Sequence, residues 1–180
     1  MPLWTWIAIA AGVIVILAGS TIAGIIAYRA VERRYLLRLV RSREGLDFVR
    51  QALGDSLGRL AEGSERELRV FADEPESGER RALNEVAARA RLLADELDTT
   101  ALPGRLLPAA EALADAAYLL GREAGRVGDE LRGESALDAL GCIDLDAVES
   151  YYRAALSAVQ SVCEACGLED SAVYGGGLYL

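Results

Sequence analysis

The chain contains no histidine and no lysine, and all 19 of its basic residues are arginine. The absence of histidine excludes Ser-His catalysis and the Glu-x-x-His pairs of di-metal carboxylate bundles, because both need an imidazole. The absence of lysine excludes the Gly-Lys-Ser/Thr ending of a phosphate-binding loop. Several common enzyme sites are therefore excluded by composition. A chain without lysine that is rich in alanine, glycine and arginine is also typical of a GC-rich bacterial genome.

The first 28 residues, Met1 to Tyr28, contain no charged side chain. As a helix, Leu3 to Tyr28 would be about 39 Å long, against a hydrocarbon core of about 30 Å. We therefore predict a transmembrane anchor at 1–28, with the lipid bilayer as a partner. A cleaved secretory signal is the alternative, but it needs a basic segment before a shorter apolar run.

Six arginines and two acids follow in the basic segment 29–45. Basic residues beside a membrane span stay cytoplasmic. We therefore predict a single-pass protein of the cell membrane, with its N-terminus outside and its C-terminal domain in the cytoplasm. The residues predicted to determine this topology are Arg29, Arg33, Arg34, Arg38, Arg41 and Arg43.

Small residues share one face of the predicted span. Such residues let two membrane helices approach closely, so this face is a candidate for dimerisation or for docking on another membrane protein. The alternative is that glycine and alanine are simply common in membrane helices. The candidate packing face consists of Gly12, Gly19, Ala23 and Ala27.

The remainder of the chain is acidic. Residues 46–180 hold 13 arginines and 26 acids, a net charge of −13, whereas residues 1–45 carry +4, which together make the overall −9. Phosphate binding needs a basic surface, so we do not expect a nucleic-acid partner. About 135 residues are enough for one small domain.

Apolar residues recur through this part of the chain at spacings of three and four, which is typical of helices in a bundle or coiled coil. We predict an all-α fold: an antiparallel bundle of about four helices at 46–167, its first helix continuous with or close to the membrane span, and a flexible Gly-rich tail at 168–180. The predicted inward positions are Leu39, Leu46, Val49, Leu53, Leu57 and Leu60; Leu83, Val86, Ala90, Leu93 and Leu97; Leu106, Ala110, Leu113, Ala117, Leu120, Ala124, Val127 and Leu131; and Leu145, Val148, Tyr152, Ala155, Val159, Val162 and Cys166.

Proline, glycine and small polar residues mark the predicted ends of these helices at 75–78, 99–104 and 133–144. The first helix ends near Glu62, or near Phe71 if Gly63 does not stop it. Ser64 with Glu67, and Asp146 with Glu149, have the spacing of a capping box.

Residues Gly54 to Gly58 read Gly-Asp-Ser-Leu-Gly, which fits both the G-x-S-x-G nucleophile elbow and a lipase signature. Both need a histidine base and a turn after a strand. Here the segment lies in a helical pattern and the chain has no histidine. We therefore expect no catalytic role for Ser56.

Three cysteines are the other candidates for chemistry. Cys163 and Cys166 form a C-x-x-C motif, and Cys142 lies 21 residues before Cys163. Three thiolates can bind a soft metal ion, but a closed zinc site needs a fourth ligand. The favoured alternative is that Cys166 continues the apolar stripe and Cys163 borders it.

The sequence shows no convergent set of polar groups of the kind that an enzyme needs. We predict a membrane-anchored, non-enzymatic helical binding protein without a cofactor: an adaptor, scaffold or accessory subunit of a cell-envelope complex. It would bind a protein partner or a second copy of itself through the transmembrane face and the helical bundle. The alternative is a membrane-tethered thiol or metal sensor that uses Cys142, Cys163 and Cys166.

Overall fold

A computed structural model describes the backbone of residues 3–167 and the side chains of Ser20, Thr21, Gly24 and residues 28–167. All regular structure in this part of the chain is α-helical, which confirms the all-α prediction. The chain divides into two compact units, Met1–Leu37 and Arg38–Leu180. The helices are α1 (Leu3–Glu62), α2 (Glu65–Asp73), α3 (Gly78–Thr99), α4 (Leu107–Ala124), α5 (Glu134–Gly141) and α6 (Leu145–Ala165).

The predicted membrane span is wrong. Among the residues that the structure describes, no helix is both long enough and apolar enough to cross a membrane. From Arg29 onward the described side chains of α1 are densely charged, so this part of the helix offers no apolar run of the roughly 20 residues that a span needs.

The predicted location fails with the span, both the cell-membrane location and the orientation with a cytoplasmic C-terminal domain. The side chains of Gly12, Gly19, Ala23 and Ala27, and the predicted tail at 168–180, lie outside the described residues. The residues that lose their assigned role in topology are Arg29, Arg33, Arg34, Arg38, Arg41 and Arg43.

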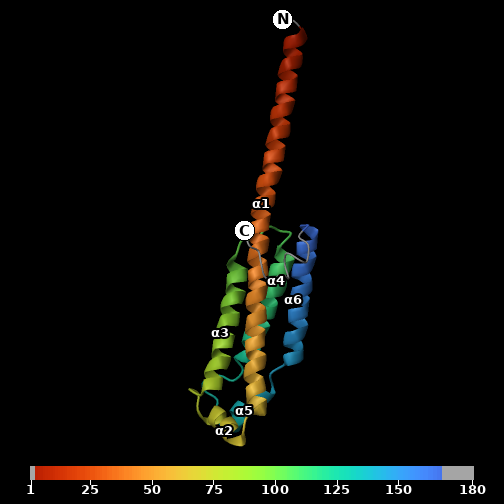
Figure 1. Cartoon of the computed structure of the whole chain (residues 1–180). Helices are drawn as coiled ribbons and strands as arrows, with labels where there is room; N and C mark the ends of the chain where they lie inside the picture. Colours follow the sequence, from red (N-terminus) through yellow and green to blue (C-terminus); the bar gives the residue numbers. More distant parts are fainter. Residues whose placement is uncertain (1–2, 168–180) are drawn as a thin grey trace. The chain divides into compact units, whose positions relative to one another are not determined.

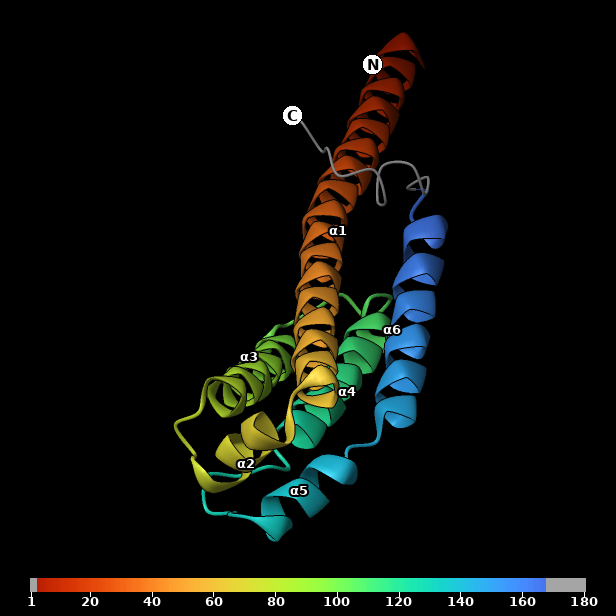
Figure 2. The same cartoon turned by 60° about the horizontal axis from the view of Figure 1, so that its bottom comes forward.

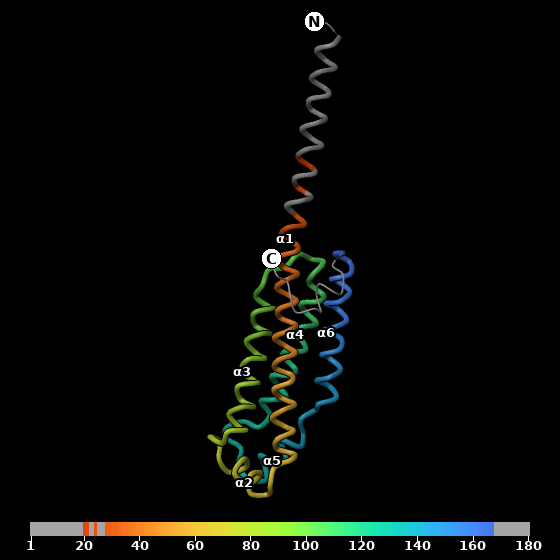
Figure 3. Tube along the Cα trace, viewed as in Figure 1, coloured from red at the N-terminus to blue at the C-terminus, as the bar shows by residue number. Residues whose placement is uncertain are grey.

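Four long helices form the bundle of the second unit, which confirms the helical-bundle prediction. Residues 38–62 of α1 lie beside α3 and α6, while α4 lies beside the same two helices (Figure 1). Ion pairs join α1 to α3, where Arg59 and Glu79 approach to 2.8 Å, and α1 to α6, where Arg50 and Glu149 approach to 3.3 Å. Neighbouring long helices run in opposite directions, as the trace in Figure 3 shows.

Two short helices, α2 and α5, lie together at one end of the bundle (Figure 2). Gly63 does interrupt the first long helix, and the predicted capping box of Ser64 and Glu67 begins α2. In contrast, α5 occupies a segment that we had predicted to be a connection. It begins after Gly133, whose φ of 55° favours glycine, and its inward side chain is the fully buried Ala136.

The inner face of α1 has a regular spacing of three and four residues. Ser56 occupies one of its positions and is only 2% exposed, whereas the predicted Leu57 is half-buried beside it. The buried positions of this face are Leu39, Ser42, Leu46, Val49, Leu53, Ser56 and Leu60.

Helix α4 is covered on most of its surface, and its contact with α3 is made by small residues. A methyl group at Gly121 would lie 3.2 Å from Arg91 Cγ and 3.3 Å from the Ala87 carbonyl oxygen. The glycine therefore allows the two helices to approach closely. The predicted stripe from Leu106 to Val127 is buried, although the helix itself already ends at Ala124.

The capping box predicted at the start of the last helix is wrong. Asp144 caps α6, with its carboxylate accepting a hydrogen bond from the Ala147 N–H at 2.9 Å. The carboxylate of Glu149 instead accepts hydrogen bonds from arginine side chains. At the other end of α6, Cys163 is buried and Cys166 is exposed, the reverse of the predicted assignment.

Candidate binding groove between α1 and α3

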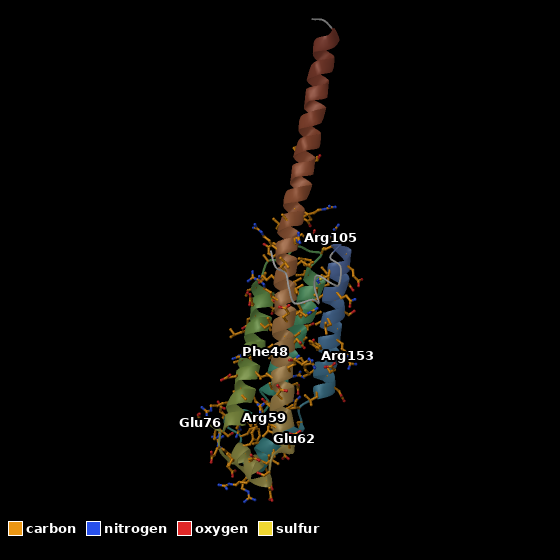
Figure 4. The ribbon with its side chains drawn as sticks, in the orientation of Figure 1. Phe48, Arg59, Glu62, Glu76, Arg105 and Arg153 are labelled. Carbon is orange, nitrogen blue, oxygen red and sulfur yellow. The ribbon has the colours of Figure 1, made fainter. Side chains whose placement is uncertain are left out.

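A groove follows the line along which α1 and α3 lie side by side in the second unit. It consists of two adjoining hollows of about 190 Å³ and about 760 Å³ that share Phe48, Val49 and Arg89 as lining residues. Its α1 wall runs from Gly45 to Arg59. At roughly 1.5 Å per residue this wall is about 21 Å long. Figure 4 labels Phe48 and Arg59 on the α3 side of α1.

The groove exists because several residues that line it are small. Gly45 and Ala52 face it from α1, and Ala82 faces it from α3. The nearest atom to a methyl group placed on Gly45 would be Leu93 Cδ1, at 4.0 Å. The larger side chains beside these small ones are consequently left uncovered.

Two large apolar side chains remain open to solvent in this groove. Phe48, on α1, is 59% exposed, and Leu92, on α3, is 68% exposed. Scattered exposed apolar residues are normal on protein surfaces, but apolar residues gathered around a hollow mark an interaction site. The floor between them is apolar as well, with Val49 buried and Leu93 half-buried.

Arg89 lies across the middle of the groove. Its guanidinium stands 5.9 Å from the centre of the Phe48 ring, and it approaches the Glu85 carboxylate to 3.7 Å. Arg89 thus lines both hollows, and its charge faces the Phe48 ring and the Glu85 carboxylate.

The other charges at the edge are partly compensated. Glu79 raises the pKa of Arg59 by accepting its hydrogen bond, and Arg38 forms an ion pair with Glu96 at 2.9 Å. Within the part of the chain that the structure describes, the carboxylates of Asp55 and Asp95 form no hydrogen bond or ion pair. Both are exposed lining residues, and Asp55 is near enough to Arg59 for its charge to help raise the pKa of that guanidinium. The lining as a whole carries four carboxylates, those of Asp55, Glu85, Asp95 and Glu96, against two arginines, so the groove is negative.

The strongest perturbation of a titratable group lies outside the groove, at Glu123. Its pKa falls to about 2, first because Arg126 donates to it, while burial acts in the opposite direction. Glu123 also accepts hydrogen bonds from Arg122 and from the backbone N–H of Asp144. An ionised carboxylate with this many donors is suited to joining α4 to the start of α6.

The three cysteines do not come together. Cys142 lies before the N-terminus of α6, whereas Cys163 and Cys166 lie near its C-terminus. Helix α6 has 21 residues, so about 30 Å of helix separates the two positions. Among the described residues there is no group of three histidine, cysteine or acidic side chains able to hold a metal ion.

Ser56, in the Gly-Asp-Ser-Leu-Gly segment, lies within α1 and is buried in the bundle. Its hydroxyl accepts a hydrogen bond from Arg59 at 3.1 Å. The helical setting expected for this segment is confirmed, and Ser56 serves as a polar member of the core.

The inner faces of the helices follow from the spacing of apolar residues, whereas the groove is not predicted by that spacing. The signal was a second stripe beside the inner face of α1, with spacings of three and four residues. Its members are Gly45, Phe48, Ala52, Asp55 and Arg59. Because the stripe mixes small, apolar and charged residues, its periodicity is not visible in hydrophobicity alone.

Comparisons with protein-family models, with curated proteins and with solved structures find no match for this chain.

Proposed function

We propose that this chain is a non-enzymatic helical binding protein, an adaptor, scaffold or accessory subunit, and that it holds a helix of a protein partner in the α1–α3 groove. The observation that carries the proposal is the joint exposure of Phe48 and Leu92 on opposite walls of one hollow. Amphipathic helices bind in such grooves by inserting apolar side chains at helical spacing. The groove is about four helical turns long, which is enough for a helix of about 14 residues.

The composition of the groove is typical of a protein interface. Its centre is apolar and includes an aromatic ring, while charged residues stand at its edges, and interfaces combine an apolar core with a polar rim. Aromatic and arginine residues are also frequent among those that dominate binding energy. Phe48 with Arg89 across its ring supplies both kinds.

A binding role is also supported by the state of the polar groups. Hydrogen bonds from its neighbours lower the pKa of Glu123 to about 2. Its carboxylate therefore stays ionised at neutral pH and is poorly suited to accept a proton as a catalytic base. Ser56 is buried without a base beside it in a chain that has no histidine.

Site-specific photocrosslinking in the native cells tests the proposal. A photoreactive phenylalanine analogue replaces Leu92 in the tagged full chain, and the matched control carries it at Tyr118. Leu92 is 68% and Tyr118 65% exposed, but Tyr118 lies on α4 and does not line the groove. We expect a distinct crosslinked protein from position 92 alone.

A second substitution, Phe48→Asp, removes that crosslinked product if the partner occupies the groove. The same product from both positions, or from position 118 alone, would contradict the proposal. Recovery of the chain crosslinked to itself from position 92 would instead identify a self-assembling scaffold.

A further inference from the structure

The charges at the groove indicate the chemistry of its partner, if the groove binds a helix as proposed above. We propose that the helix held there is cationic and amphipathic, with basic side chains on both edges of its apolar stripe that pair with Asp55 and Asp95. This inference rests on the proposed function and specifies its partner.

The two carboxylates stand on opposite walls of the groove, Asp55 on α1 and Asp95 on α3. The pair of Arg59 with Glu79 and the contact of Phe48 with Arg89 define the antiparallel register of the two helices. In this register Asp55 is level with about Ala82, and Asp95 lies about 13 residues further along α3, or about 20 Å.

Among the described residues, a helix that fills the groove therefore meets, near each end and on each side, one carboxylate that forms no hydrogen bond or ion pair. In a heptad pattern with apolar a and d positions, the e and g positions flank the apolar stripe and approach charges on neighbouring helices. Arginine or lysine at these positions can reach Asp55 and Asp95.

The two arginines that line the groove, Arg59 and Arg89, do not balance its four carboxylates. The guanidinium of Arg59 is held by two hydrogen bonds to Glu79, and Arg89 lies between Glu85 and the Phe48 ring. An acidic occupant would add like charges to Asp55 and Asp95 without a free cation to compensate them.

A second copy of the bundle is a poor occupant for the same reason. Residues 46–180 carry 26 acids and 13 arginines, so two such surfaces repel each other. The partner that complements the groove is a separate protein with a basic helix.

The test uses the full chain and two synthetic helical peptides of about 17 residues. Both peptides carry leucine at a and d and alanine or glutamine at b, c and f; they differ only at e and g, which are lysine in one and glutamate in the other. Dissociation constants are measured by fluorescence anisotropy at low and at moderate salt.

We expect the lysine peptide to bind about tenfold more tightly than the glutamate peptide at low salt, and the ratio to fall as salt screens the charges. The double variant Asp55→Asn/Asp95→Asn should abolish the difference. The matched control, Asp98→Asn/Asp115→Asn, removes two exposed acids that do not line the groove and should leave the difference unchanged.

Equal binding of both peptides, lost on Phe48→Asp, would overturn the charge preference while supporting a helix-binding groove. Binding of neither peptide, or binding unaffected by Phe48→Asp, would overturn both proposals. Self-association of the full chain that is abolished by the Asp55/Asp95 double variant would assign the groove to a second copy and overturn the inference.

Discussion

Glu123 shows how a single charged residue is kept inside this bundle. Its side chain is fully buried, and burial by itself disfavours an ionised carboxylate. Donation from Arg126, from the Asp144 N–H and from Arg122 outweighs that cost and lowers the pKa of Glu123 to about 2. The negative charge thus joins the end of α4 to the residue that caps α6.

Because the folded-state pKa of Glu123 is depressed, its contribution to stability is present above the unfolded pKa of about 4.5 and is lost as the pH falls toward 2. The pKa shift corresponds to about 3 kcal/mol of the free energy of unfolding at pH 7. We expect Glu123→Gln to lower stability by about that amount at pH 7 and by little near pH 2. Denaturant titrations between these pH values measure the effect.

The matched control for this experiment is Glu111→Gln, which changes an exposed carboxylate on the same helix. It should alter the free energy of unfolding by less than about 0.5 kcal/mol. If Glu123→Gln proves as stable as the wild-type chain at pH 7, the ionised carboxylate does not hold α4 to α6.

Glycine has opposite roles in two of the long helices. In α1, Gly54 has no atom within 4 Å of the place that a methyl group would occupy. In α4, a methyl group on Gly121 would meet the Ala87 carbonyl oxygen and the Ala90 methyl group, both at 3.3 Å. One glycine is thus open to solvent, while the other sets the spacing between α3 and α4.

Alanine should therefore act in opposite directions at these two positions. Gly54→Ala should raise the free energy of unfolding by about 0.5 to 1 kcal/mol, because alanine has less backbone entropy to lose in a helix. Gly121→Ala should lower it by about 1 to 3 kcal/mol, because a closely packed contact must open. Thermal and denaturant unfolding of both variants measures the two changes, and an equal gain at both positions would show that α3 and α4 tolerate a wider spacing.

The positions of α2 and α5 show what the sequence pattern can define within an element. Ser64 and Glu67 predicted the start of α2 because a capping box involves only residues three apart. The analogous prediction for Asp146 and Glu149 failed because Glu149 binds Arg50 and Arg153 instead. A local capping signal competes with partners from other helices, and the sequence does not reveal those partners.

At the scale of the whole bundle, Arg80 holds one end together. It is fully buried on α3 and donates to the carbonyl oxygens of Phe71 and Ala72 in the last turn of α2, and to those of Gly128 and Leu131 after α4. Burial is the main reason that the pKa of Arg80 lies below its usual value. One planar guanidinium thus connects three parts of the chain.

We expect Arg80→Met to lower the free energy of unfolding by about 3 kcal/mol, because methionine removes a donor from four carbonyl groups, of which only those of Ala72 and Gly128 keep a backbone donor among the described residues. Arg80→Lys should also be destabilising, since an ammonium group cannot reproduce the planar fork of donors. Urea unfolding measures both effects, and Arg81→Met is the control because Arg81 is exposed. Similar stabilities of the variants at positions 80 and 81 would contradict this role.

The sequence by itself determined that the bundle is helical and which stripes point inward, because a spacing of three and four residues depends only on the order of apolar residues along the chain. The pattern predicts Leu57 and Cys166 as inward positions, but the buried residues are Ser56 and Cys163. These two differences show the limit of the pattern. Residues one and three positions apart lie about 100° and about 60° apart around a helix axis, and the packing of the helices determines which of them faces inward.

Only the tertiary structure decided that Phe48 and Leu92 stay exposed and that four carboxylates line the groove against two arginines. Whether an apolar side chain is covered depends on the side chains of the helix opposite it, and here Ala82 and Gly45 are too small to fill the space. Whether a carboxylate is paired depends on which arginines the fold brings near it. These relations link residues far apart in the sequence, such as Phe48 with Ala82 or Gly45 with Leu93, so the order of residues alone does not contain them.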